Sequence, residues 1–215
     1  MLKAVFWDND GVLVDTEELY FEATRTVLAR AGYELTTEQY IDIGLHQGRS
    51  VFDLIRDRYD PEAIEDLRSV RNDLYAERLS AGIPALDGIQ AVLAGLHRRV
   101  RMGVVTSCNP DHFKLIHRST GLLQYFDFVL TSHDYEHTKP HPAPYLAALA
   151  RSGFAPDECI AIEDSPRGLL AAHAAGLRCV VIPRGLTIGG DFTGAYRVAS
   201  DTRELSDILA PLIEE

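Results

Sequence analysis

Short apolar runs alternate with helical patterns along most of this chain. The apolar runs cover residues 2–7, 100–105, 126–130, 159–162 and 179–182, and their content of Val, Ile and Phe favours buried strands. Helical periodicity lies between them, around residues 88–97, 111–119, 143–151 and 166–175. Because strands that alternate with helices are typical of βαβ units, we predict an α/β fold. Its core would be a Rossmann-like parallel sheet with helices on both faces.

One stretch, from Thr16 to about Ser80, breaks this alternation. It contains several helical patterns and no convincing strand, and Gly82, Pro84 and Gly88 then mark the return to the alternating pattern. We therefore predict an inserted helical-bundle cap domain. In chain order, the α/β core comprises residues 1–15 and 84–215, and the cap comprises residues 16–83.

Capping residues suggest where the inserted helices begin and end. Asp15 is placed to cap the first helix, with Glu18 in the capping-box position, and Gly32 is placed to end it. The last helix is predicted to begin at Asp60-Pro61, with proline at its first position.

Composition narrows the possible partners. Hydrophobic residues make up 46% of the chain, which supports a globular interior. The 21 Lys and Arg against 32 Asp and Glu give a net charge of −11, which argues against a nucleic-acid partner. No apolar run approaches the roughly 20 residues of a membrane helix, and the three cysteines show no paired spacing. We expect a cytoplasmic protein without nucleic-acid or membrane partners; the sequence does not determine the oligomeric state, and a monomer is slightly favoured.

Polar residues follow the predicted strands at the edge where an open parallel sheet binds its ligands. These segments are Asp8-Asn9-Asp10-Gly11, Thr106-Ser107, Lys139-Pro140 and Glu163-Asp164-Ser165. Two carboxylates about 4 Å apart repel by roughly 4 kcal/mol at an effective dielectric of 20, so this cluster calls for a cation. Ligation by oxygen alone, without His or Cys, suits Mg²⁺.

The same edge could hold a phosphate. Lys139, Thr106 and backbone amides near Gly11 could neutralise its charge. A carboxylate such as Asp8 can attack phosphorus to form an aspartyl phosphate. A second carboxylate two residues on, Asp10, could protonate the leaving oxygen and later activate water.

Four ordered motifs carry a family resemblance over nearly the whole chain. They are Asp8-x-Asp10-Gly11-Val12-x-Val14-Asp15-Thr16, Thr106-Ser107, Lys139-Pro140-x-Pro142 and Ile162-Glu163-Asp164-Ser165-x-x-Gly168. Together they resemble the haloacid dehalogenase superfamily. The resemblance implies Asp8 as nucleophile, Asp10 as general acid and base, and Thr106 and Lys139 as holders of the phosphoryl group. It also implies Mg²⁺ held by Asp8, the backbone carbonyl of Asp10, Asp164 and, through water, Glu163.

Other residues are candidates for binding a small phosphorylated substrate. They are Gly11, Arg49, Thr106, Ser107, Asn109 and Lys139. Arg49 lies in the glycine-rich loop Gly44–Ser50, which could close over a substrate or could be a surface turn with a solvated arginine. Arg71-Asn72 carries a weaker claim of the same kind. Taken alone, Thr106 and Ser107 could also be helix-capping residues.

The insertion resembles the cap of the β-phosphoglucomutase-like branch, which includes phosphatases for sugar phosphates. Those mutases carry a histidine where this chain has Tyr20, and a lysine where Asn109 or Pro110 stands. We therefore predict a phosphatase, with a sugar phosphomutase as the alternative and a non-catalytic phosphometabolite-binding module as a third reading. A dehalogenase is disfavoured because it lacks the aspartate corresponding to Asp10.

Three further features have ordinary interpretations. His133, His137 and His141 are interpreted as solvated loop residues, because Pro140 and Pro142 prevent a continuous helix. Cys108 is interpreted as a packed thiol. Residues 184–195 could form a loop over the site or a surface excursion.

Overall fold

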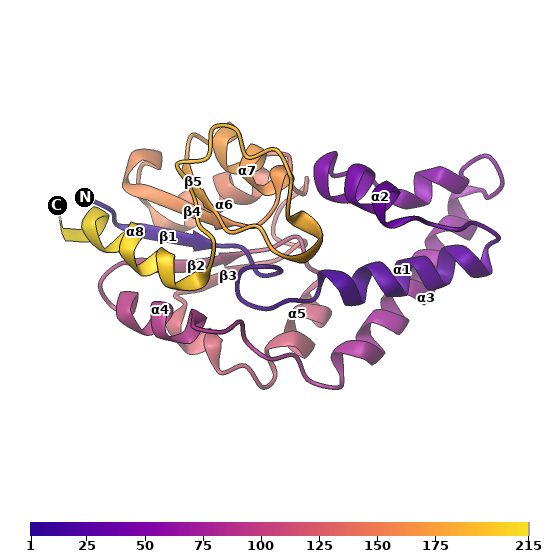
Figure 1. The fold of residues 1–215 in the computed structure, drawn as a ribbon, viewed down its shortest axis with the longest axis horizontal. Coiled ribbons are helices and arrows are strands. Elements are labelled where there is room, and N and C mark those ends of the chain that lie inside the picture. Colours follow the sequence, from indigo (N-terminus) through magenta and orange to yellow (C-terminus); the bar gives the residue numbers. More distant parts are fainter. Residues whose placement is uncertain (215) are drawn as a thin grey trace.

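A parallel six-stranded sheet forms the centre of the computed structural model, which describes residues 1–214 (Figure 1). The strands are β1 (Ala4–Trp7), β2 (Arg101–Val105), β3 (Phe128–Leu130), β4 (Cys159–Glu163), β5 (Arg178–Val181) and β6 (Arg197–Val198). Their order is β3-β2-β1-β4-β5-β6, and every pairing is parallel. The order reverses beside β1, so a ligand site is expected where β1 and β4 end.

Helices cover both faces of this sheet, as predicted. One face carries α4 (Ile89–Leu96), α5 (Pro110–His117) and α8 (Thr202–Glu214), and the other carries α6 (Ala143–Ser152) and α7 (Pro166–Ala174) (Figure 1). The predicted α/β fold class is therefore confirmed.

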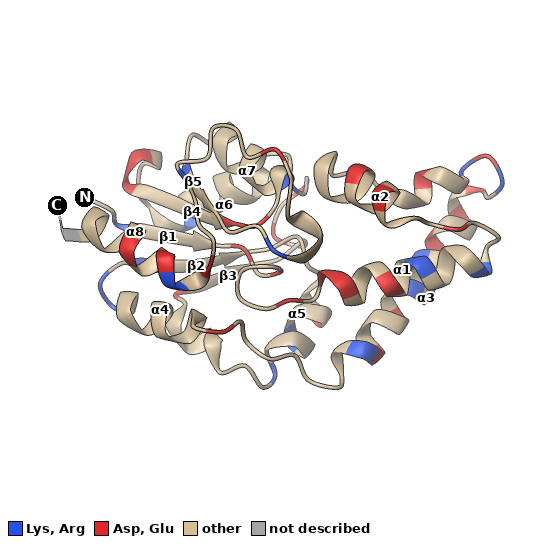
Figure 2. Cartoon of the chain, viewed as in Figure 1, with Lys and Arg blue, Asp and Glu red and all other residues tan. Residues whose placement is uncertain are grey.

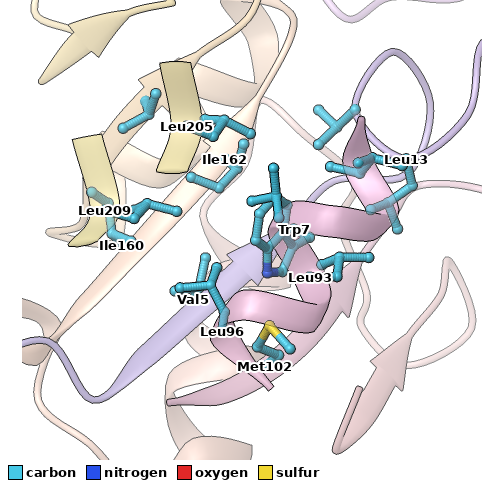
Figure 3. Close-up of a cluster of buried hydrophobic side chains, with 14 of the residues drawn as sticks. Val5, Trp7, Leu13, Leu93, Leu96, Met102, Ile160, Ile162, Leu205 and Leu209 are labelled. Carbon is cyan, nitrogen blue, oxygen red and sulfur yellow. The ribbon is translucent and has the colours of Figure 1, made fainter. Parts of the chain in front are cut away.

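Strand β1 shows why its sequence is continuously apolar. Val5 and Trp7 pack on the face covered by α4 and α8 (Figure 3), while Ala4 and Phe6 pack on the face covered by α6 and α7. All four side chains are completely buried. Since successive side chains of a strand point to opposite faces, a strand covered on both sides needs an apolar residue at every position.

A second group of helices lies beyond the carboxyl ends of the strands, at the opposite end of the molecule from both termini (Figure 1). It consists of α1 (Glu17–Arg30), α2 (Thr37–Tyr40), the π-helix η1 (Ile41–His46), the 3₁₀ helix η2 (Val51–Ile55) and α3 (Pro61–Leu79). We call residues 17–79 the helical layer. It encloses its own hydrophobic cluster, in which Leu28 and Ile55 are fully buried.

The predicted start of α3 and the predicted end of α1 at Gly32 agree with the structure, whereas the start of α1 differs. The Asp60 carboxylate caps α3 by accepting a hydrogen bond from the Ala63 N–H at 2.8 Å. The prediction for Asp15 was wrong: it is exposed, and Thr16 occupies the N-cap position without a capping hydrogen bond. The Thr16 hydroxyl instead donates to the carboxylate of Asp10, so a tertiary contact replaces the local cap.

The structure also contains elements that the sequence pattern did not predict. They are β6, α8 and the short 3₁₀ helices η3 (Leu122–Tyr125), η4 (Pro156–Glu158) and η5 (Gly185–Thr187). Within residues 1–214, no helix combines the length and the apolar character that crossing a bilayer requires.

Candidate active site

A cavity of about 460 Å³ lies between the carboxyl edge of the sheet and the helical layer. Figure 2 shows acidic residues at this junction, where the strand ends face the start of α1. Most of the predicted site residues line the cavity: Asp8, Asp10, Arg49, Thr106, Ser107, Asn109, Lys139 and Asp164. Glu163 and Gly11 do not belong to this lining, and their positions are described below.

The Lys139 ammonium group bridges two carboxylates. Its Nζ lies 2.7 Å from Asp8 Oδ1 and 2.6 Å from Glu163 Oε1, and it donates to the Val105 carbonyl at 2.8 Å. Lys139 is only 3% exposed, and Glu163 is fully buried. Burial alone would lower the lysine pKa, but Asp8 and Glu163 outweigh it and raise that pKa above its ordinary value. The lysine is therefore a fixed positive charge beside Asp8.

Tyr145 and Gly168 fix the position of the Glu163 carboxylate. The Tyr145 hydroxyl donates to its Oε1 at 2.6 Å, whereas its Oε2 is buried without a hydrogen-bond partner among the described residues. Gly168 packs against this carboxylate so closely that a Cβ atom there would lie 1.9 Å from Oε2. The motif glycine is thus required for the position of Glu163.

Three carboxylates could hold a metal ion. One oxygen from each of Asp8, Glu163 and Asp164 lies within 4.8 Å of the other two. Burial, followed by the charges of Asp8 and Glu163, raises the pKa of Asp164 well above its usual range. An all-oxygen donor set, one of whose oxygens has no partner, fits Mg²⁺. The Asp10 side chain is not part of this group.

Asp10 lines the cavity but makes different contacts. Its carboxylate accepts hydrogen bonds from the Thr16 hydroxyl and, at 3.3 Å, from the Asn9 side-chain amide. Burial, and next the charge of Asp8, raises the pKa of Asp10 to about 6. A carboxyl group with such a pKa can exchange protons near neutral pH, as general acid and base catalysis requires.

A buried chain of hydrogen bonds reaches Asp10 from α5. His117 Nε2 lies 2.7 Å from Asn9 Oδ1, and His117 Nδ1 lies 2.9 Å from the Thr120 hydroxyl. Because an amide oxygen can only accept, the Nε2–H donates to Asn9. Burial lowers the His117 pKa to about 4, so the ring is neutral near pH 7 and its Nδ1 accepts from the Thr120 hydroxyl. The chain orients the Asn9 amide toward Asp10.

His117 should make folding stability depend on pH. Its pKa rises from about 4 in the folded chain to about 6.5 in the unfolded chain, so its contribution is complete above pH 6.5 and is lost as pH falls toward 4. Between pH 7 and pH 5, the free energy of unfolding of wild type should fall by about 2 kcal/mol more than that of His117→Gln. Urea unfolding of both proteins at the two pH values measures this difference. Parallel losses in both proteins would contradict it.

Gly11 has a structural role beside Asp164. Its N–H donates to the Val14 carbonyl at 2.7 Å, so this amide is already used within the loop. A Cβ atom at Gly11 would lie 2.1 Å from Asp164 Oδ2, and its φ is +78°. The residue permits close packing against Asp164, and its predicted contact with substrate stays a prediction.

The residues after β2 surround the next part of the cavity. The Thr106 hydroxyl accepts from the Cys108 N–H at 3.0 Å, and the Thr106 carbonyl accepts from the Tyr135 hydroxyl at 2.5 Å. The Ser107 hydroxyl is buried and has no hydrogen-bond partner in residues 1–214. Asn109 caps α5, accepting from the Asp111 N–H at 2.8 Å. Asn109, and not Thr106 or Ser107, is therefore the helix cap.

The loop that carries Arg49 touches the core beside the buried lysine. Arg49 is exposed, and its guanidinium lies 3.6 Å from the Asp53 carboxylate at the edge of the cavity. Gly48 has a φ of +65°, and a Cβ atom there would lie 2.4 Å from Pro140 Cδ and 3.1 Å from the Lys139 carbonyl. Gly48 thus permits the close contact between the helical layer and the Lys139-Pro140 segment.

Several cavity residues were not predicted from the sequence. They include Glu17, Tyr40, Arg167 and Thr187. Arg167 lies inside the fourth motif, in one of its variable positions, and this location was the only signal available. The start of segment 184–195 is now explained, because Thr187 lines the cavity and Leu186 packs against the hydrophobic cluster of the helical layer.

The remaining sequence features have the ordinary roles expected of them. His133, His137 and His141 are exposed in a segment of turns, and the rings of His137 and His141 lie 4.6 Å apart. Cys108 is partly buried, and burial, followed by the charge of Asp10, raises its thiol pKa well above the usual range. A thiol with a raised pKa is a poor nucleophile at neutral pH.

Comparison with known proteins gives concordant results. Residues 5–182 match the family described as haloacid dehalogenase-like hydrolase. The chain is 28% identical to the phosphoglycolate phosphatase of Nitrosococcus oceani, over 88% of this chain and 87% of that protein. It is 29% identical to the fructose-1-phosphate phosphatase YqaB of Escherichia coli, over 82% and 94% respectively. A crystal structure of a CbbY variant from Rhodobacter sphaeroides with xylulose-(1,5)-bisphosphate superimposes with a TM-score of 0.83 at 27% identity, covering 95% of this chain and 96% of that one.

Proposed function

The chain belongs to the haloacid dehalogenase-like hydrolase family, and on that premise we propose that it is a Mg²⁺-dependent phosphatase acting on a small phosphorylated metabolite through an aspartyl phosphate. Its phosphatase relatives place it among the phosphoric monoester hydrolases. The observation that carries the mechanism is the pairing of Asp8 with the buried Lys139, beside Asp164 and within a cavity that also contains Asp10. The same proposal includes that the enzyme is cytoplasmic and monomeric and that its partner is a small phosphate ester.

In the first half-reaction, a carboxylate oxygen of Asp8 attacks the phosphorus atom of the ester. The bond between phosphorus and the leaving oxygen breaks as the new bond to Asp8 forms. Asp10 gives its proton to the leaving oxygen, so the product departs as a neutral alcohol. Lys139 balances the charge of the transferring group, and the Thr106 and Ser107 side chains contact its oxygens.

In the second half-reaction, water attacks the phosphorus atom of the aspartyl phosphate. Asp10, now a carboxylate, accepts the proton of this water. The bond between phosphorus and the Asp8 oxygen breaks, which releases inorganic phosphate and restores the Asp8 carboxylate.

The carboxylates of Asp8 and Asp164 and the Asp10 backbone carbonyl would hold Mg²⁺, with Glu163 acting through water. When bound, this ion would neutralise the negative charge of the phosphoryl oxygens. The residues fit the ion because they supply only oxygen donors at the point where buried carboxylates meet.

We assign to residues 16–83 the role of a cap that closes over the substrate and excludes bulk water. The contact between Gly48 and Pro140 supports this role, because it brings the helical layer directly onto the segment of Lys139. Tyr20 favours hydrolysis over a phosphomutase reaction: its ring lies 5.1 Å from the Tyr75 ring and 4.3 Å from the Arg71 guanidinium. A packed phenol does not supply the proton transfer that a histidine could.

Gly48→Ala should lower kcat/KM for phosphate release about tenfold, because a side chain at positive φ is strained by about 1–2 kcal/mol and would also collide with Pro140. Gly44→Ala is the matched control in the same segment, since its nearest neighbouring atom is 3.9 Å away. Steady-state kinetics of both variants test the expectation. Equal activities would argue against closure at Gly48.

The function is tested by measuring phosphate release from a panel of phosphorylated metabolites, including β-glucose 1-phosphate. Removal of divalent metal with EDTA should abolish release, and Mg²⁺ should restore it. Formation of glucose 6-phosphate faster than phosphate release would instead establish the mutase. No release from any compound would favour the binding module.

A further inference from the structure

Two guanidinium groups line the cavity without an ion-pair partner. Arg71 comes from α3 of the helical layer, and Arg167 comes from α7 of the core. Within residues 1–214, neither group has a carboxylate oxygen within 4.0 Å. A guanidinium removed from water without an ion-pair partner is costly, so this arrangement suggests a ligand that supplies one.

Arg71 is the more deeply buried of the two, at 9% exposure. Its guanidinium lies 4.3 Å from the Tyr20 ring centroid and 5.6 Å from that of Phe52. Its Nε donates to the Asn72 side chain at 2.9 Å, and one terminal nitrogen lies 3.5 Å from the Thr24 hydroxyl. These neutral neighbours hold the planar group in place and leave its charge uncompensated.

Arg167 extends from the first turn of α7, directly after the Asp164-Ser165 segment. Its Nε is buried and has no hydrogen-bond partner among the described residues. Glu17, the acidic side chain that raises the Arg167 pKa most, forms no ion pair with it and accepts a hydrogen bond from the Tyr40 hydroxyl. Although burial opposes the charge, Glu17 and Asp8 raise the pKa of Arg167, so the group stays cationic.

The two arginines act on the same part of the cavity. Burial raises the pKa of the Tyr20 hydroxyl, and the charges of both Arg71 and Arg167 oppose that rise. Tyr20, which also lines the cavity, lies 4.3 Å from the Arg71 guanidinium, and the charge of Arg167 reaches the same hydroxyl. Among the described cationic side chains that line the cavity, Arg71 and Arg167 are the two without an ion pair, whereas Lys139 is paired with Asp8 and Glu163.

We propose that Arg71 and Arg167 bind a second anionic group of the substrate, on the alcohol half that leaves with Asp10's proton. The inference rests on the proposed phosphatase function and defines its substrate class as phosphate esters that carry a further anion. Guanidinium groups bind phosphate and carboxylate through the same paired N–H donors, so either anion fits this chemistry.

The first test compares substrates that differ only in the second anion. Fructose 1,6-bisphosphate is paired with fructose 1-phosphate, and 2-phosphoglycolate with ethylene glycol monophosphate. Wild type with Mg²⁺ should show kcat/KM at least about tenfold higher for the doubly anionic member of one pair. The preferred pair identifies the second anion as phosphate or carboxylate. Equal or lower values for the doubly anionic member in both pairs would overturn the inference.

The second test removes each guanidinium. Arg71→Gln and Arg167→Gln should each reduce the preference for the doubly anionic member about tenfold. Arg58→Gln and Arg151→Gln, both exposed arginines, are the controls and should leave it unchanged. Thermal unfolding identifies any variant that fails to fold. If Arg71→Gln fails to fold, the result for Arg167→Gln decides the test. If a folded variant keeps the wild-type preference, the substituted arginine does not bind the second anion.

Failure of the proposed function gives a different result. Absence of phosphate release from every compound, including p-nitrophenyl phosphate, would overturn the phosphatase assignment. Calorimetric binding of fructose 1,6-bisphosphate and fructose 1-phosphate would then still decide the inference, because the arginines would hold the second anion without cleavage. Equal affinities would reject it.

Discussion

Asp8→Asn is expected to lower Mg²⁺-dependent phosphate release by at least about 10³-fold, because an amide cannot attack phosphorus as a carboxylate does. The substitution preserves shape, and an amide oxygen can still accept the hydrogen bond that Lys139 donates at 2.7 Å. A large loss would therefore reflect chemistry and not misfolding. Initial rates on the preferred substrate measure the loss, and intact-mass spectrometry of acid-quenched enzyme detects the phosphorylated protein.

Asp15→Asn is the matched control for this variant, because Asp15 is an exposed carboxylate in the same segment. It should retain wild-type rates. The covalent phosphate should be detected in wild type and in Asp15→Asn and be absent from Asp8→Asn. A phosphorylated Asp8→Asn protein would show that another residue is the nucleophile and would reject the proposed mechanism.

Lys139→Met is expected to reduce both activity and stability. The substitution leaves Asp8 and the fully buried Glu163 without their common counter-charge, and removal of one partner from a buried ion pair costs about 3–5 kcal/mol. Urea unfolding in metal-free buffer should show a lower midpoint with an unchanged slope. Phosphate release should also fall, because no fixed cation would remain beside Asp8.

Two further variants separate the causes of this loss. Lys114→Met replaces an exposed lysine of α5 and should leave stability nearly unchanged. The double variant Lys139→Met/Glu163→Gln should recover part of the stability, since it removes one of the uncompensated carboxylates. A midpoint for Lys139→Met equal to that of wild type would mean that the ion pairs contribute nothing measurable.

The sequence alone determined the fold class and the edge at which the polar motifs meet. Apolar runs such as Ala4–Trp7 are local signals, because a strand buried on both faces needs an apolar residue at each position. Once the strands are parallel, their carboxyl ends lie at one edge, and residues as distant as Asp8 and Lys139 must approach each other. The motif order then indicated the family without any coordinates.

Only the tertiary structure decided the contacts that have no periodic signal in the sequence. The bond from Thr16 to Asp10 displaced the expected Asp15 cap, and the chain from His117 through Asn9 joins residues that no local pattern connects. Arg167 occupies a variable motif position, so its role depends on the cavity that the helical layer completes. Local propensity determines which elements form, whereas close packing between elements determines which polar groups keep a partner and which remain free for a ligand.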